Sequence, residues 1–220
     1  MFIAPRHRPL IGAFITLSII GLGVWGCDKG SKIVEGTQRL PATFTRQEDL
    51  KPETFPYDEG FLVLAGTQIP VTLEESKEGN ILTFAVKANG ALIEREQYQF
   101  DEAGFRFLGG PGITFQPAIP LVRYPMKSDE KWEWSGKMVQ SGETYDAKAE
   151  IAAKSELLNT AAGEFMTLMI QVDLKLDVGT KEPAVRLLKF WIAPGEGVIR
   201  REFGASSSRE PRAPEPTTEQ

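Results

Sequence analysis

The stretch AAGEFMTLMIQVDLKLD, residues 161–177, decides the fold of this chain. Aliphatic side chains occupy every second position from Leu168 to Leu176, and most of the residues between them are polar. This period of two is typical of a β-strand with one buried face and one wet face. A second apolar run, FWIAPGEGVI at residues 190–199, follows after a turn. Residues 161–203 therefore predict two long strands and a glycine–proline corner that carries a short final strand.

The same alternation runs through most of the chain before this stretch. The sequence from Tyr145 to Ala153 places apolar side chains on one face and charged side chains on the other. After residue 27 we find no pattern for a helix of three or more turns. Short strands joined by turns indicate a curled antiparallel sheet. We predict an all-β fold, an antiparallel meander of about nine or ten strands that forms a curved half-barrel, a barrel or a sandwich.

Five residues are assigned to turn geometry. Asn89-Gly90 between two strands is a strong hairpin signal, because both residues accept the positive φ of a type I′ turn. Gly163 is expected to place the hairpin before the 168–176 strand, and Gly195 and Gly197 to shape the corner.

The amino terminus has the form of an export signal. Arg6, His7 and Arg8 precede an uncharged apolar run at residues 10–26. Val24-Trp25-Gly26-Cys27 then resembles a bacterial lipobox, which implies cleavage before Cys27 and a diacylglycerol on its sulfur. Trp25 departs from that pattern, where a smaller residue is usual. The alternative is an uncleaved amino-terminal membrane anchor.

Asp28 follows the candidate lipid-carrying cysteine. An aspartate there resembles the enterobacterial signal that keeps a lipoprotein in the inner membrane. We therefore expect a protein of the cell envelope, anchored by lipid on the extracytoplasmic face, with the inner membrane favoured.

Composition divides the chain into four parts. Residues 1–27 are the lipoprotein signal peptide with Cys27, and residues 28–59, with three prolines among scattered charges, are a flexible tether and lead-in. Residues 60–204 form the antiparallel β-domain. Residues 205–220 contain no aromatic residue and no aliphatic residue larger than alanine, so we predict a disordered tail.

Charge and composition exclude several classes of function. Removal of Arg6 and Arg8 with the leader lowers the 25 basic residues to 23 against 30 acidic ones, a net charge of −7, so nucleic acid is not an expected partner. His7 is the only histidine and Cys27 the only cysteine. The mature chain therefore lacks the imidazole or free thiol that Ser-His-Asp and Cys-His catalysis need, and it has no His or Cys ligand for a metal. We expect no cofactor.

Carboxylate chemistry is the enzymatic class that survives this exclusion. Glu94 with Glu96, Asp146 with Glu150, and Asp173 with Asp177 each share one face of a predicted strand. Two acids across a cleft suffice for glycoside hydrolysis. Because lysines are interleaved with these acids, a solvated sheet face is the simpler interpretation.

Large side chains in the strands can either fill the core or line a pocket. The residues with both possibilities are Trp132, Trp134, Tyr145, Ile170 and Trp191. Aromatic residues on a sheet can contact lipid or sugar, but most of them pack in the core of a β-domain.

Three segments together resemble an uncharacterised family of exported bacterial β-proteins. They are Tyr124-Pro125-Met126 with Trp132-Glu133-Trp134, then Ala162-Gly163-Glu164-Phe165, then the corner that begins at Trp191. The resemblance covers residues 121–203. It implies a curved antiparallel half-barrel, distantly similar to the periplasmic carriers of the Lol system. The helices that plug those carriers are not evident in this sequence.

These observations predict a membrane-anchored envelope lipoprotein that is not an enzyme and acts as a binding or scaffold module. Its expected partners are the membrane, through Cys27, and a hydrophobic ligand or an envelope protein. The alternative is a carrier of an acyl or lipid ligand in a half-barrel cavity, and the remote alternative is a carboxylate-dependent envelope hydrolase.

Overall fold

The computed structural model of the chain describes residues 40–55, 57–64, 67–160, 163–203 and 207–210. All of them lie in one compact unit, Val34–Gln220. The predicted signal peptide with Cys27 and Asp28, the first part of the tether and the end of the tail fall outside the described residues. No helix within the described ranges is long and apolar enough to cross a membrane.

The described chain consists of strands and one short 3-10 helix. In chain order the elements are β1 (Thr43–Phe44), η1 (Gln47–Asp49), β2 (Glu59–Leu64), β3 (Thr67–Glu78), β4 (Ile81–Ala88), β5 (Ala91–Asp101), β6 (Gly104–Gly110), β7 (Ile113–Arg123), β8 (Met126–Lys127), β9 (Lys131–Gln140), β10 (Glu143–Thr160), β11 (Gly163–Asp177), β12 (Ala184–Ala193), β13 (Gly197–Phe203) and β14 (Ser207–Glu210).

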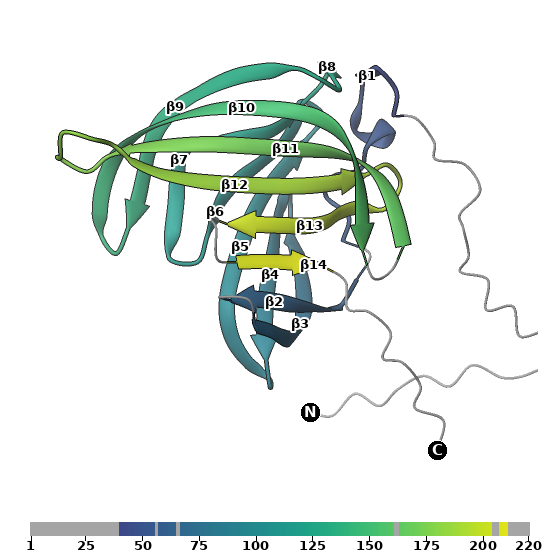
Figure 1. The fold of residues 1–220 in the computed structure, drawn as a ribbon, viewed down its shortest axis with the longest axis horizontal. Helices are drawn as coiled ribbons and strands as arrows, with labels where there is room; N and C mark the ends of the chain where they lie inside the picture. Colours follow the sequence, from purple (N-terminus) through teal and green to yellow (C-terminus); the bar gives the residue numbers. More distant parts are fainter. Residues whose placement is uncertain (1–39, 56, 65–66, 161–162, 204–206, 211–220) are drawn as a thin grey trace, which may run out of the picture. The chain divides into compact units, whose positions relative to one another are not determined.

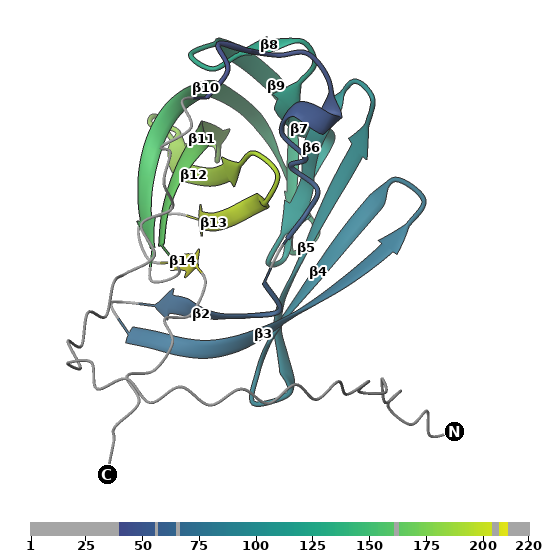
Figure 2. The same ribbon diagram turned by 90° about the vertical axis from the view of Figure 1, so that its right-hand side faces the viewer.

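These strands form an antiparallel meander that closes into a barrel. Neighbours in the ring follow chain order from β2 to β14, except that β7 pairs with β9, because β8 pairs with β1 instead. The ring closes where β14 pairs with β2. Figure 1 shows β10, β11 and β12 side by side, and Figure 2 looks along the barrel with β4 to β7 on its right. The predicted all-β antiparallel meander is confirmed.

The ring has more strands than the nine or ten predicted, and β2, β7 and β14 explain the difference. β2 is a short apolar run without alternation, and β14 lies inside the predicted disordered tail. β7 continues through Pro117 and Pro120, and proline is unusual inside a strand. The residues of β7 between Thr114 and Ile119 have no partner on β6, and the last pair of β7 with β9 is at Gln116. Pro117 therefore lies at a position without a ladder partner, where the missing N–H of proline costs no hydrogen bond.

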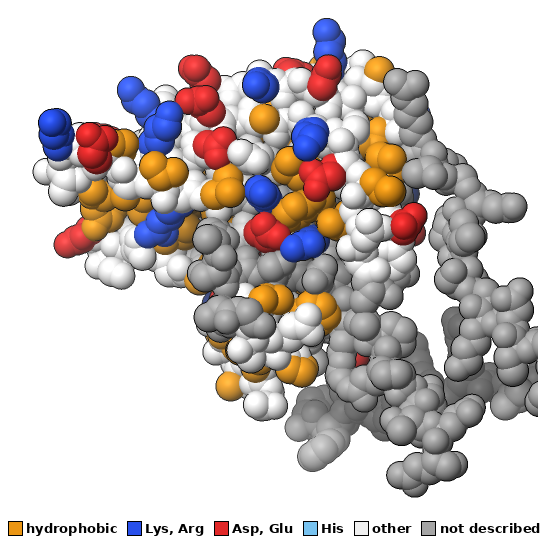
Figure 3. All heavy atoms as spheres, viewed as in Figure 1, with side chains coloured by type: hydrophobic (Ala, Val, Ile, Leu, Met, Phe, Trp, Pro, Cys, Tyr) orange, Lys and Arg blue, Asp and Glu red, His pale blue; other side chains and the backbone are white. Residues whose placement is uncertain are grey.

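The alternation in β10 and β11 sorts side chains to the two faces of the barrel wall. Ala149 pairs with Leu174 on the buried face, and both are at most 3% exposed. On the outer face Glu150 pairs with Asp173 but accepts a 3.0 Å bond from Lys175. Figure 3 shows the result, a surface on which both charges are interspersed with apolar side chains over these strands. Mixed charge keeps this wide face solvated.

The lead-in belongs to the folded domain, contrary to the prediction of a tether through residue 59. Phe44 and Leu50 are fully buried in the main core. The segment is bonded at both ends, because Ser128 N donates to the Ala42 carbonyl (3.2 Å) and Val198 N donates to the Thr54 carbonyl (3.0 Å). The apolar side chains of the lead-in are spread among charges and prolines, so no alternating pattern signalled a core segment.

The corner between β12 and β13 depends on glycine at one position. Gly197 has φ of 92°, and a Cβ there would lie 1.9 Å from the Thr54 carbonyl oxygen. The corner and the lead-in therefore approach each other at backbone distance. Gly163 and Gly195 also have positive φ, and Asn89 and Gly90 have φ of 50° and 77°, as a type I′ turn requires.

Trp191 lies on the outer face of β12, opposite to the main core. It packs in a small cluster with Leu158, Met169, Ala193 and Ile199, and is 4% exposed. The Arg200 guanidinium carbon lies 5.0 Å from the centroid of its ring. The cluster therefore seals the outside of the β10–β13 wall.

Replacement of this tryptophan tests whether the outer cluster is structural. Trp191→Ala should lower the free energy of unfolding by about 3–5 kcal/mol, because it empties a large buried aromatic site. Val185→Ala on the same strand is the control. Val185 is 66% exposed, so a change within about 0.5 kcal/mol is expected. Urea denaturation measures both, and equal effects of the two substitutions would show that the cluster does not stabilise the wall.

Candidate functional site

A buried polar cluster lies inside the barrel between two strands that are not neighbours in the ring. Glu96 on β5 is 0% exposed and Arg201 on β13 is 4% exposed. Arg201 Nη1 donates to Glu96 Oε2 at 2.5 Å, and the Tyr98 hydroxyl donates to the same oxygen at 2.8 Å. The ion pair therefore connects opposite walls through an otherwise apolar core.

Aromatic rings surround the Arg201 guanidinium. Its central carbon lies 4.5 Å from the Phe55 ring centroid and 5.1 Å from that of Phe84. Such contacts stabilise a desolvated cation. Burial raises the pKa of Tyr98 to about 12, although the charge of Arg201 opposes the shift. The Tyr98 hydroxyl therefore stays protonated at neutral pH and keeps its bond to Glu96.

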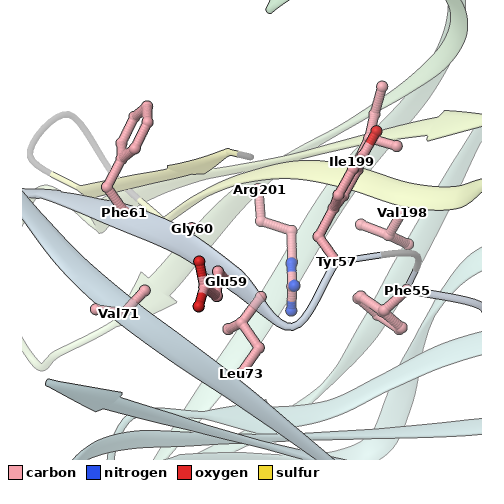
Figure 4. Close-up of a pocket in the computed structure, with 10 residues that line it drawn as sticks. All are labelled: Phe55, Tyr57, Glu59, Gly60, Phe61, Val71, Leu73, Val198, Ile199 and Arg201. Carbon is pink, nitrogen blue, oxygen red and sulfur yellow. The ribbon is translucent and has the colours of Figure 1, made fainter. Parts of the chain in front are cut away.

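A crevice in the barrel wall leads to this cluster. It lies at the seam between β13 and β2, and its lining is mostly apolar, with Arg201 and Glu59 as the charged residues. In Figure 4 the Arg201 side chain reaches from β13 into the space between Glu59 and Tyr57. The cavity volume is about 20 Å³, which is room for about one water molecule.

Arg201 offers an unused donor to this crevice. Its Nε is buried and has no hydrogen-bond partner within the described structure. A buried guanidinium N–H without an acceptor is costly, and native proteins rarely leave one. The geometry therefore provides a place for an acceptor oxygen, from water or from a ligand group, against an apolar wall.

The four residues of β14 pair with only part of the length of β13 and β2. β14 pairs with β13 only at Arg201 and Glu202, and with β2 from Phe61 to Leu64. Within the described chain, Glu59 and Gly60 of β2 have no pairing partner on β14, and the crevice lies beside them.

The residues predicted to face the core or a ligand do not come together at one site. Trp132 and Trp134 are 7% exposed and Ile170 is fully buried, all in the main core. Trp132 Nε1 donates to the Pro120 carbonyl at 3.0 Å, and Trp134 packs edge-on against Phe115. Of the two possibilities for these three residues, their burial identifies core packing.

The other two predicted residues are placed differently. Tyr145 is partly exposed, packs against the main core and is bonded to Glu143, whereas Trp191 belongs to the outer cluster. Cys27, the predicted lipidation site, lies outside the described residues.

The acid pairs on β10 and β11 lie on the outer face of the wall with polar neighbours. Lys137 donates to Asp146 at 3.1 Å, and Gln171 donates to Asp173 at 3.0 Å. Glu96 is engaged by Arg201 inside the barrel. In the part of the chain that the structure describes, no group of three or more acidic, histidine or cysteine side chains is placed to hold a metal ion.

Sequence reasoning placed Glu96 on one face with Glu94 but missed Arg201 as its partner. The sequence did contain one indication that Glu96 points into the barrel: it lies on the same face of its strand as Tyr98, a large aromatic residue. Arg201 is 105 residues away in sequence, and only the closure of the barrel brings β13 opposite β5.

Comparison with known proteins gives no family for this chain. No family model matches it, and no curated protein matches it. Solved structures with a similar arrangement include the hypothetical lipoprotein YmcC from Escherichia coli, at 14% identity and a TM-score of 0.40, with 71% of this chain and 85% of that chain covered.

Two further solved structures have a similar arrangement. One is a protein described as exported, with a YmcC-like fold, from Bacteroides fragilis, at 12% identity and a TM-score of 0.41, covering 71% of this chain and 96% of that one. The other is described as a lipoprotein from Parabacteroides distasonis, at 13% identity and a TM-score of 0.35, covering 71% and 95%. These neighbours are lipoproteins or exported proteins by description, but likeness at TM-scores below 0.5 carries no argument about this chain. The three sequence motifs and the similarity to Lol carriers stay predictions.

Substitutions in the buried pair test its energetic role. Arg201→Met should lower the free energy of unfolding by about 3–5 kcal/mol, because it leaves the Glu96 carboxylate buried without its cation. Adding Glu96→Gln should recover part of that loss, since glutamine can still accept from Tyr98. We expect a coupling energy of about 1–3 kcal/mol from a double-mutant cycle in urea. The exposed pair Lys175–Glu150 is the control, with coupling below about 1 kcal/mol. Strictly additive effects at Arg201 and Glu96 would contradict the account.

The Tyr98 hydroxyl predicts a loss of stability in alkali. The pKa of Tyr98 in the folded protein is about 12, above the ordinary value of 10.0 that applies to the unfolded chain. Its contribution is therefore complete below pH 10 and is lost as the pH rises from there toward 12, because only the unfolded state releases the proton in that window. Urea denaturation at pH 9, 10 and 11 should show this decline. Tyr98→Phe should make this decline shallower without abolishing it, because burial also raises the pKa of Tyr124 and the hydrogen bond to Glu143 raises the pKa of Tyr145. An unchanged slope in Tyr98→Phe would contradict the assignment.

Proposed function

We propose that this chain is a lipid-anchored protein of the cell envelope whose β-domain binds a partner at the β13–β2 seam and performs no catalysis. The observation that carries the proposal is Arg201, a nearly buried cation with a free Nε on the wall of an apolar crevice. Apolar walls with a small number of placed polar groups are the common design of binding sites. The anchor is Cys27, the single cysteine, at the lipobox position, with Asp28 favouring the inner membrane.

Residue chemistry supports binding over turnover. The chain after Cys27 has neither histidine nor cysteine, so a nucleophile there would lack an imidazole base. At the crevice, Glu96 already accepts from Arg201 and Tyr98, and Glu59 is exposed at the rim. Glu96 is therefore engaged in structural hydrogen bonds, and Glu59 faces solvent.

The filled interior argues against the alternative of an acyl carrier. Side chains such as Phe84, Phe107 and Phe190 occupy the inside of the barrel and are at most 1% exposed. The crevice volume of about 20 Å³ is far below the several hundred Å³ of typical small-molecule sites. Phe44 and Leu50 of the lead-in are fully buried in the same core.

Photo-crosslinking in living cells tests the binding role. A photoreactive residue at Glu59, on the rim of the crevice, should give one discrete adduct, whose mass identifies the partner. The same residue at Lys148, exposed on the outer face of β10, is the matched control and should give none. Equal adducts at both positions, or none at Glu59, would refute the proposed site.

The membrane fraction from the same cells tests the anchor. The amino-terminal peptide should begin at Cys27 and carry a diacylglycerol mass, and Cys27→Ser should release the protein from the membrane. A peptide that retains residues 1–26 would instead support the uncleaved anchor.

A further inference from the structure

β14 is the weakest link in the ring of strands. It has four residues, Ser207 to Glu210, with no apolar side chain among them. It makes two residue pairs with β13 and four with β2. Each main-chain hydrogen bond between β14 and its neighbours contributes only about 0.5–1.5 kcal/mol.

The neighbours of β14 offer more pairing than β14 uses. β2 begins at Glu59 and β13 begins at Gly197, whereas the pairs with β14 stop at Phe61 and Arg201. The next residue of the chain is Pro211, which has no N–H and cannot donate to the ladder at that position. A proline-free strand in the same place could continue along β2 toward Glu59.

The crevice lies where such a longer strand would run. Its apolar lining includes Phe61, Val71, Leu73 and Val198, so an apolar side chain on the added strand would cover this lining from outside. The same strand would bring main-chain carbonyl oxygens beside Arg201 Nε, which has no acceptor in the described structure. An extended peptide segment would therefore suit both features of the site, the apolar lining and the free Nε donor.

We propose that the seam between β13 and β2 accepts an extended, proline-free segment of a partner protein in place of β14. This inference rests on the proposed binding function and names its partner class. The incoming strand adds main-chain bonds to β2 and β13, as strand addition at a sheet edge does generally, and its alternate apolar side chains cover the apolar lining of the crevice. β14 acts as an internal competitor that keeps the edges paired until the partner arrives.

Peptide binding to the full chain with Cys27→Ser tests the exchange. The probe is a fluorescein-labelled eight-residue peptide of alternating threonine and valine, and the control has the same length with proline at alternate positions. We expect saturable anisotropy with the first peptide and none with the second. Ending the chain after Phe203 should tighten binding at least tenfold, because the tethered competitor has a high effective concentration.

A reversible lock distinguishes the seam from other edges. Val63 and Ser208 are Cα partners in β2 and β14, a spacing that suits a disulfide. The oxidised Val63→Cys/Ser208→Cys protein should lose peptide binding and regain it on reduction. Binding that survives the lock, or no binding to either the full or the shortened chain, would overturn the proposal. A Glu59 adduct that proves to be a lipid would also overturn it and leave the proposed binding function standing.

Discussion

The buried ion pair between Glu96 and Arg201 is the interaction on which this barrel depends. It joins β5 to β13 across the interior, and both residues are less than 5% exposed. Burial of two charges is costly unless each has a partner, so the two walls must meet at this point for the fold to form. Tyr98 and the Phe55 ring complete the shell around the pair. The lead-in, which supplies Phe55, is therefore part of the same arrangement.

The position of this pair makes the β13–β2 seam unlike the rest of the wall. Elsewhere long strands such as β10 and β11 pair along most of their length. At the seam a four-residue polar strand lies between two longer edges, and Arg201 takes part both in the interior pair and in the crevice. The ion pair that anchors β13 inside the barrel is thus next to β14, the strand that closes the wall with the fewest pairs. This combination would let the edges open without loss of the core.

Local patterns in the sequence predicted most of the strands and the antiparallel order, because a period of two and Asn89-Gly90 are local signals. The core role of Trp132 and Trp134 stayed open, since an aromatic residue has the same pattern in a core and in a pocket. Glu96 with Arg201 was beyond prediction, because their contact depends on barrel closure. β14 was missed because Ser207–Glu210 has polar side chains and pairs through its backbone.

Native-state hydrogen exchange of the full chain measures the central claim, that the wall is weakest where β14 closes it. Amides of β2 and β13 that pair with β14 should exchange much faster than those in the β10–β11 ladder, because a short polar strand opens locally without global unfolding. Phe190 and Ile170 in the core should keep the slow exchange of the global transition. Protection at the β14 pairs equal to that of the β10–β11 ladder would contradict a seam that opens.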